Sequence, residues 1–241
     1  MGHVLTDHGL CLTYLRNSDV IDDVDQAHIL DDLSDDTLDG DPLPWLTRYR
    51  LDAYDHLVLV TDRSSDRHLG FLAASNGATP REDFLLLETA FVATAARGQN
   101  LMRRMLAFAM LRIGGMGPVP SIVAACTRSP HCYRIMRDTA RRFSGATFFP
   151  EPDSVTIDFH TATLAQRIVR AIGSRHRFHA ATGMIRGVGG ARRQPISGDP
   201  QLDSLFGQHM QPADRVLTVL DLRGEDEATI FDDARRIYRS R

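Results

Sequence analysis

The most informative pattern in the chain is ETAFVATAARGQNL, residues 88–101. An apolar segment typical of a buried strand leads into a short turn that contains arginine and glycine, and an apolar helical pattern follows. Backbone N–H groups converge at the start of such a helix, where the helix dipole is positive. The pattern therefore predicts an anion site that suits a diphosphate. From the residues alone, a plain turn with a solvated arginine stays an open alternative.

The spacing V-x-x-x-x-R-G from Val92 to Gly98 resembles motif A of the GNAT superfamily, the acetyl-CoA-dependent N-acetyltransferases. The resemblance implies that the strand backbone pairs with the pantetheine arm and that the following loop holds the CoA pyrophosphate. It also implies acetyl-CoA, or another acyl-CoA, as co-substrate. The residues that it assigns to cofactor binding are Phe91, Val92, Arg97, Gly98, Gln99, Asn100 and Leu101.

Two residues depart from the family pattern [QR]-x-x-G-x-[GA]. Arg97 matches its first position, whereas Asn100 and Met102 stand where a glycine and a small residue are usual. Asparagine tolerates left-handed backbone angles better than most residues, so we expect Asn100 to keep the turn. Met102 is expected to crowd the first helical turn against the phosphates. These departures keep a second hypothesis open, a degenerate non-catalytic GNAT-like domain that binds a nucleotide or a partner.

The order of predicted elements over residues 10–160 also resembles this family. It implies an α+β fold with a mixed, mostly antiparallel central sheet flanked by helices. Residues 1–241 are then a single domain, with residues 160–212 a helical and loop insertion before the last strand. Apolar patterning predicts strands at 10–15, 56–61, 68–75, 84–93, 121–127, 146–149, 155–159 and 215–222. It predicts helices within 19–41 and at 99–113, 130–143, 161–172 and 227–238, and a mobile excursion over 173–200.

Two local signals refine this assignment. The segments 56–61 and 68–75 flank a polar turn and are expected to form an antiparallel hairpin. Ser129-Pro130 is expected to open the helix at 130–143, because serine accepts a first-turn N–H and proline lacks an N–H that would be unpaired there.

Acylation of an amine needs a base, donors for the oxyanion and an acid for the leaving thiolate. Glu88 is the candidate base, because a glutamate within an apolar strand is expensive to bury without a task or a partner. A strand-end glutamate paired with an arginine is the alternative. The resemblance places the oxyanion donor near the backbone N–H of Val92. It makes Tyr133 the candidate acid, one turn earlier than usual, with simple packing at the helix start as the alternative.

Charge is distributed unevenly along the chain. All 28 basic residues are arginines, and the lack of lysine excludes Schiff-base chemistry, pyridoxal phosphate attachment and a Walker A loop. Residues 1–66 carry 15 acids against 4 arginines, whereas residues 97–193 carry 16 arginines against 4 acids. Residues 161–198 hold seven arginines and no acid, which predicts a face that attracts anions; neutralisation across the fold is the alternative. A nucleic-acid partner is disfavoured, because aromatic residues do not interleave with these arginines.

The acceptor is expected to be a small-molecule or peptide amine. If acyl transfer holds, the resemblance implies that the early helices line the acceptor site, so the acids within 19–41 favour a cationic amine. The alternative is that Asp22, Asp25, Asp32 and Asp36 occupy the solvent face of a helix. A homodimer is a further expectation.

The remaining residue types argue against other classes of site. Cys11, Cys126 and Cys132 form no C-x-x-C pair, so neither a disulfide framework nor a structural zinc site is indicated. His176 and His179 are spaced like metal ligands but lack a third ligand nearby, and no metal is expected. No apolar run approaches the length of a membrane span and no signal peptide is evident, so we expect a cytoplasmic protein.

Overall fold

The chain forms two compact units in the computed structural model, which describes residues 2–5, 9–16, 21–34, 50–151, 158–188, 199–211 and 213–240. The first unit comprises Met1–Ser75, Leu87–Val119 and Phe231–Arg241, and the second comprises Asn76–Leu86 and Pro120–Ile230. Strands β4 (Arg67–Ala78) and β5 (Asp83–Val92) and helix α6 (Glu227–Arg239) pass from one unit into the other.

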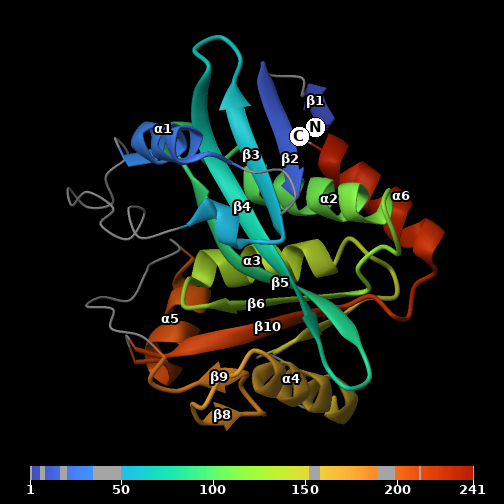
Figure 1. The fold of residues 1–241 in the computed structure, drawn as a ribbon. Helices are drawn as coiled ribbons and strands as arrows, with labels where there is room; N and C mark the ends of the chain where they lie inside the picture. Colours follow the sequence, from blue (N-terminus) through green and yellow to red (C-terminus); the bar gives the residue numbers. More distant parts are fainter. Residues whose placement is uncertain are drawn as a thin grey trace. The chain divides into compact units, whose positions relative to one another are not determined.

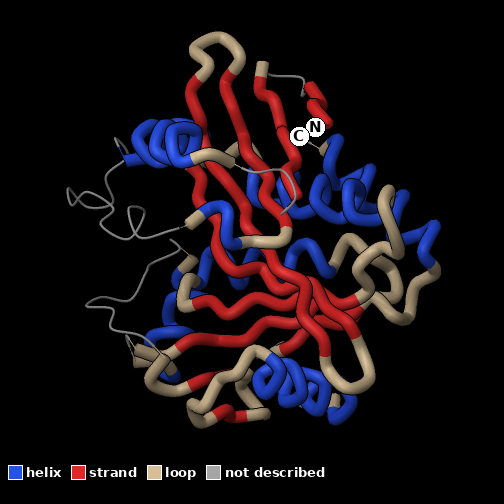
Figure 2. The backbone as a smooth tube through the Cα atoms, in the orientation of Figure 1, coloured by secondary structure: helices blue, strands red, loops and turns tan. Residues whose placement is uncertain are grey.

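The first unit is built on neighbouring strands in the order β1, β2, β3, β4, β5. Strand β1 (Gly2–Leu5) pairs with β2 (Leu10–Arg16), β2 pairs with β3 (His56–Asp62), and β3 pairs with β4, each time antiparallel. The long ribbon of β3 and β4 is the hairpin expected from residues 56–61 and 68–75, and the expectation is confirmed (Figure 2).

Both faces of these strands carry buried side chains, and successive side chains point to opposite sides, so one face packs against α1 (Asp23–Ser34) and the other carries residues such as Val58 and Leu72. Leu57, Phe71 and Phe91 share the α1 face, and Ile29 and Leu33 of α1 pack onto it. Helix α2 (Leu101–Gly114) packs against β2 and β3 and runs behind them in Figure 1. The acidic region 19–41 is therefore helical over its central part, and residues 35–41 lie outside the described residues.

The second unit is organised around β10 (Arg215–Asp221). Strand β10 pairs antiparallel with β6 (Ile122–Thr127), with β7 (Thr147–Phe149) and with β9 (Met184–Ile185), and β9 pairs with β8 (Phe178–His179). Helices α3 (Pro130–Ala140), α4 (Phe159–Ala171) and α5 (Pro200–His209) belong to this unit. Leu164 and Ile168 of α4 pack on Leu217 and Val219 of β10, and Figure 2 shows this helix beside the strand.

The α+β class with antiparallel ladders flanked by helices is confirmed. One strand assignment was wrong: Phe159 begins α4, where the side chain of Asp158 accepts the N–H of His160, while residues 155–157 lie outside the described part of the chain. The region 173–200 also holds more regular structure than its composition suggests, because β8 and β9 form within it. The helix at 130 begins as expected, with Ser129 Oγ accepting the N–H of Cys132 at 3.3 Å.

Candidate functional site: the turn between β5 and α2

The turn after β5 has the left-handed geometry that its sequence predicts. A short 3₁₀ turn, Thr94–Ala96, leads into Arg97, and Gly98 and Asn100 then adopt φ values of +81° and 57°. Glycine reaches such angles without a clash, and asparagine does so more readily than other residues. The expectation that Asn100 keeps the turn is confirmed. A Cβ on Gly98 would meet no atom within 4 Å, so the outer side of the turn is open.

The first turn of α2 starts without a side-chain cap. Asn100 is the N-cap residue, yet its side chain accepts no hydrogen bond from the helix, while its carbonyl accepts the N–H of Arg104 at 3.0 Å. By contrast, Ser129, Asp158 and Asp199 each cap the helix that follows them. The N–H groups of a first helical turn have no partner within the helix. At α2 no cap side chain occupies the position where an anion would bind.

The assigned cofactor residues divide into an exposed group and a buried group. Arg97, Gly98, Gln99 and Asn100 are exposed, and Arg97 Nε donates to the carbonyl of Val92 at 3.1 Å. This bond folds the arginine side chain back toward the end of β5. Leu101 is 2% exposed and fixes the start of α2 in the core, and Phe91 is 5% exposed. The exposed residues thus present a guanidinium and backbone N–H groups to solvent, while the buried residues Phe91 and Leu101 anchor the turn in the core. Met102 is half-buried.

Glu88 lies on β5 but is exposed. The argument that burial makes this glutamate expensive was therefore wrong, because the strand buries Leu87 and Phe91 and leaves Glu88, three residues from Phe91, on the other face. Its neighbours on that face, Ala90 and Val92, are half-buried. The role of Glu88 as a base stays a prediction that rests on position and not on burial.

Tyr133 lies on α3 in the second unit and is 1% exposed. Its hydroxyl donates to the carbonyl of Pro150 at 2.8 Å, and its ring meets Phe148 and Phe206 edge to face at centroid distances of 5.4 and 5.5 Å. A proton held in this bond reaches a thiolate only after the bond breaks. The proposed acid role remains a prediction, and the contacts agree with the packing alternative. Glu88 and Tyr133 belong to different units.

Some acids and arginines of the two charged regions have local partners. Asp22 accepts the N–H of Asp25 at 2.7 Å, and both residues are exposed, as a solvent face requires. Asp32, by contrast, is mostly buried against β4. Arg167 pairs with Glu82 at 2.8 Å, and Arg186 pairs with Asp214 at 2.5 Å. At least two of the seven arginines in 161–198 are therefore neutralised within the second unit. Asp36, Arg192 and Arg193 lie outside the described residues.

Several other features of the described residues bear on function. They contain no group of three or more histidine, cysteine, aspartate or glutamate side chains that could hold a metal, and His179 Nδ1 instead lies 3.1 Å from Thr182 Oγ1. None of the three cysteines forms a disulfide, and burial raises the pKa of Cys132. None of the helices in this part of the chain combines the length and apolar character of a membrane span.

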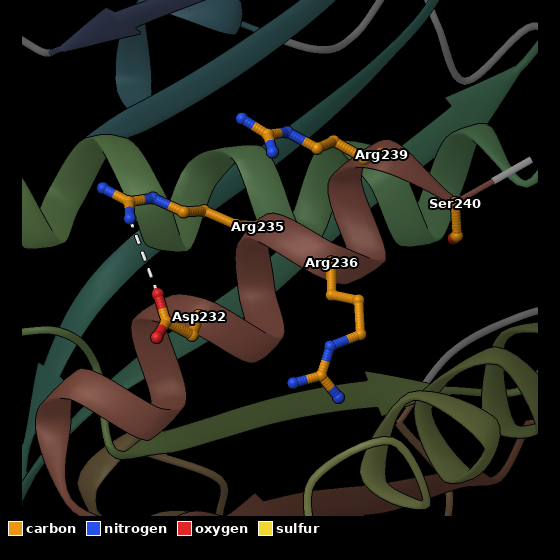
Figure 3. Close-up of a pocket in the computed structure, with 5 residues that line it drawn as sticks. All are labelled: Asp232, Arg235, Arg236, Arg239 and Ser240. Carbon is orange, nitrogen blue, oxygen red and sulfur yellow. Dashed lines mark hydrogen bonds and ion pairs between the residues drawn. The ribbon is translucent and has the colours of Figure 1, made fainter.

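A surface hollow of about 660 Å³ lies along the last turns of α6. Arg235 and Arg239 extend from one side of this helix and Arg236 from the other (Figure 3). Arg235 pairs with Asp232 at 3.5 Å, and Arg236 pairs with Asp233 at 2.9 Å. Arginines in the last turn of a helix complement its dipole, so this hollow needs no ligand to explain its charge.

Asp32 and His28 of α1 form a cluster of titratable side chains with His68 of β4 that was not predicted from the sequence. The Asp32 carboxylate accepts from the backbone and, at 2.9 Å, from the ring of His68. These residues are up to 40 positions apart, and no spacing in the sequence indicates that they meet.

No protein-family model matches the sequence, and no curated protein matches it. Among solved structures, the chain is similar to the diaminobutyrate acetyltransferase EctA from Paenibacillus lautus in complex with L-2,4-diaminobutyric acid and coenzyme A. The identity is 16%, the match covers 89% of this chain and 97% of that one, and the TM-score is 0.44. A ribosomal-protein-S5-alanine acetyltransferase from Vibrio fischeri gives 10% identity, coverage of 94% and 100%, and a TM-score of 0.40. An acetyltransferase of the GNAT family from Desulfovibrio desulfuricans gives 11% identity, coverage of 88% and 99%, and a TM-score of 0.40.

Proposed function

We propose that the chain is a GNAT-type N-acyltransferase that moves an acyl group from acetyl-CoA, or another acyl-CoA, to an amine. The observation that carries the proposal is the turn between β5 and α2. Two left-handed positions, Gly98 and Asn100, lead into a helix whose N-cap side chain makes no capping bond. Together with the V-x-x-x-x-R-G spacing, this geometry suits the diphosphate of a CoA thioester.

The residues of the turn fit the donor in three respects. The open space beside Gly98 admits a phosphate oxygen close to the backbone. The first-turn N–H groups of α2 supply donors at the positive end of the dipole. The guanidinium of Arg97 is exposed on the same turn and carries a fixed positive charge. The proposal assigns Phe91 and Val92 to the pantetheine arm through their backbone, because the Phe91 side chain is committed to the core.

The reaction is a direct attack of the amine on the thioester in a ternary complex. The thioester supplies the electrophilic carbonyl carbon. Glu88 is the proposed base that accepts a proton from the ammonium, and its exposure leaves it accessible to an amine from solution. The backbone N–H near Val92 would stabilise the oxyanion, and Tyr133 would donate to the thiolate once its bond to Pro150 opens. The acceptor is a small-molecule or peptide amine.

A thermal-shift titration tests the donor site without knowledge of the acceptor. A ligand that binds only the native state raises the melting temperature as its concentration exceeds its Kd. The expected result is a concentration-dependent rise in melting temperature with CoA and with acetyl-CoA. 3′-Dephospho-CoA should give most of this rise, whereas pantetheine, which has no diphosphate, should give none. A shift with a short RNA and none with any CoA would favour a non-catalytic binding domain instead. Release of free thiol from acetyl-CoA in the presence of an amine panel then tests turnover.

A further inference from the structure

His68 of β4 is hydrogen-bonded to Asp32 of α1, an arrangement in which a carboxylate orients a histidine that can accept a proton. Asp32 Oδ2 lies 2.9 Å from the backbone N of His68 and 2.9 Å from its Nδ1. Arg67 Nε lies 3.6 Å from Asp32 Oδ1, and the ring of His28 meets the ring of His68 nearly at right angles, with centroids 6.0 Å apart. The side chains of Asp32 and His68 are 11% and 17% exposed. In the part of the chain that the structure describes, the charged and titratable groups with contacts around His68 are Asp32, His28 and Arg67.

A β-bulge aims His68 at α1. Val60 of β3 is opposite Gly70 of β4, but the next residue, Thr61, is opposite His68, so Leu69 is an extra residue on β4. Strand side chains alternate, so without the bulge His68 would share the face of Gly70, away from the α1 side where Phe71 packs. Bulges redirect side chains in this way and are frequent beside active sites.

The hydrogen bonds decide which ring nitrogen of His68 carries the proton. Burial opposes ionisation of Asp32, but the hydrogen bonds from the backbone and ring of His68 outweigh it, so the pKa of Asp32 lies below its ordinary value. An ionised carboxylate only accepts hydrogen bonds, so the Nδ1 of His68 must be the donor. In the neutral ring Nε2 then carries the lone pair, which is the tautomer of a general base.

The pair lies beside the end of β5 that leads into the donor turn. The N–H of Ala93 donates to the carbonyl of Leu69, the bulge residue, at 2.8 Å. At the neighbouring Gly70 the strands approach so closely that a Cβ would lie 2.5 Å from the carbonyl oxygen of Phe91. His68 shares the face of Phe91, whereas Glu88 lies on the opposite face.

We propose that His68, oriented by Asp32, accepts a proton from an amine that approaches on the α1 face. The inference rests on the proposed function and assigns this proton to His68 as an alternative to Glu88, because the two side chains lie on opposite faces of the sheet. A proton moves from the ammonium to His68 Nε2 and on to water. The freed amine then forms the N–C bond and the C–S bond breaks. The second nitrogen proton is released as the amide forms, and the thiolate takes one proton to leave as CoA thiol.

The alternative is that His68 only connects α1 to β4 through its hydrogen bond to Asp32. The variant His68→Asn distinguishes this structural role from proton acceptance. Asparagine places an N–H near the position of Nδ1, so it can keep the bond to Asp32, but it has no Nε2. His179→Asn is the matched control, because His179 is exposed and bonds locally to Thr182. Both variants and Glu88→Gln are assayed by CoA release from acetyl-CoA with four amines: an alkyl diamine, an amino alcohol, an aminoglycoside and a peptide with a free N-terminus.

The expected result is that His68→Asn lowers kcat about 100-fold or more, in the range of general-base effects, while KM for acetyl-CoA changes less than about twofold. The control should keep wild-type kcat, and both variants should melt close to wild type. A His68→Asn enzyme that keeps most of the wild-type kcat overturns the inference, and so does activity that depends on Glu88 alone. If wild type binds no CoA or acylates none of the amines, the proposed function fails and the inference fails with it, a result visible in wild type alone.

A second measurement does not depend on turnover. Long-range ¹H–¹⁵N NMR of histidine-labelled wild-type protein reports which ring nitrogen is protonated. The expected spectrum has His68 in the Nδ1–H tautomer, identified by the signal that disappears in His68→Asn. An Nε2–H tautomer at neutral pH would overturn the assignment of His68 as a proton acceptor.

Discussion

Replacing Gly98 by alanine tests whether the turn after β5 binds the donor. Gly98 has φ +81° and a Cβ added to it would meet no atom within 4 Å, so the substitution changes only the local backbone energy. Gly9, at φ +74° and equally open, is a matched control outside the turn. Left-handed angles disfavour an L-residue by roughly 1–2 kcal/mol. Both variants should therefore lose about 1 kcal/mol of unfolding free energy, which is about 2–4 °C in melting temperature for a chain of this size.

The two variants should differ in acetyl-CoA affinity. If alanine relaxes the turn at position 98, one phosphate contact of an N–H group is lost, and hydrogen bonds to charged groups contribute about 1.5–3 kcal/mol each. Because about 1.4 kcal/mol is tenfold in Kd, Gly98→Ala should bind acetyl-CoA roughly 10- to 100-fold more weakly. Gly9→Ala should bind like wild type.

Isothermal titration calorimetry with acetyl-CoA measures the affinities, and urea unfolding followed by circular dichroism measures the stabilities. If both variants lose the same stability and both bind acetyl-CoA with wild-type affinity, the assignment of this turn to donor binding is refuted. An equal loss of affinity in both would show that binding follows stability and not the turn.

Four further outcomes follow from the structure. Arg97→Ala should weaken CoA binding by about tenfold in calorimetry, the loss of one charge-assisted contact; unchanged affinity counts against the motif assignment. Glu88→Gln should lower turnover while CoA still binds, and a fully active variant removes Glu88 from the mechanism. Tyr133→Phe leaves a buried backbone carbonyl without its donor and should cost about 1–2 kcal/mol in urea unfolding; a loss of kcat at wild-type CoA affinity would in addition support the acid role. Burial of Asp214 opposes its ionisation, but two backbone N–H groups and Arg186 outweigh it and lower its pKa. Its stabilisation is therefore present above about pH 3.9 and is lost as pH falls through the folded-state pKa, and Asp214→Asn should flatten that part of the stability profile.

Local patterns were predicted from the sequence because their physical causes are local. The turn at residues 97–100 needs two residues that accept left-handed angles, and Gly98 and Asn100 are such residues. The start of α3 needs an oxygen before a proline, and Ser129 supplies it. The hairpin of β3 and β4 follows from an apolar run on either side of a polar turn. Each of these features depends on neighbours within a few positions in the chain.

Side-chain environments were decided by the tertiary structure. An apolar strand sequence does not reveal which face is covered, so Glu88 looked buried and is exposed. The sequence does not show whether the hydroxyl of Tyr133 has a hydrogen-bond acceptor; in the fold it donates to the carbonyl of Pro150, 17 positions away. The short strands β8 and β9 form because β10 offers β9 a partner, although the surrounding region 173–200 is rich in glycine and arginine.

The pair of Asp32 and His68 is the clearest example of a contact that depends on the tertiary structure. Both residues are visible in the sequence, but their meeting depends on α1 packing over β4 and on one extra residue, Leu69, that turns His68 toward the helix. The sequence by itself determined the left-handed turn after β5 and the start of the helix that follows it, since backbone angles and helix ends are local properties. Only the tertiary structure decided which titratable groups meet, because contacts between distant segments depend on packing and on the register of neighbouring strands.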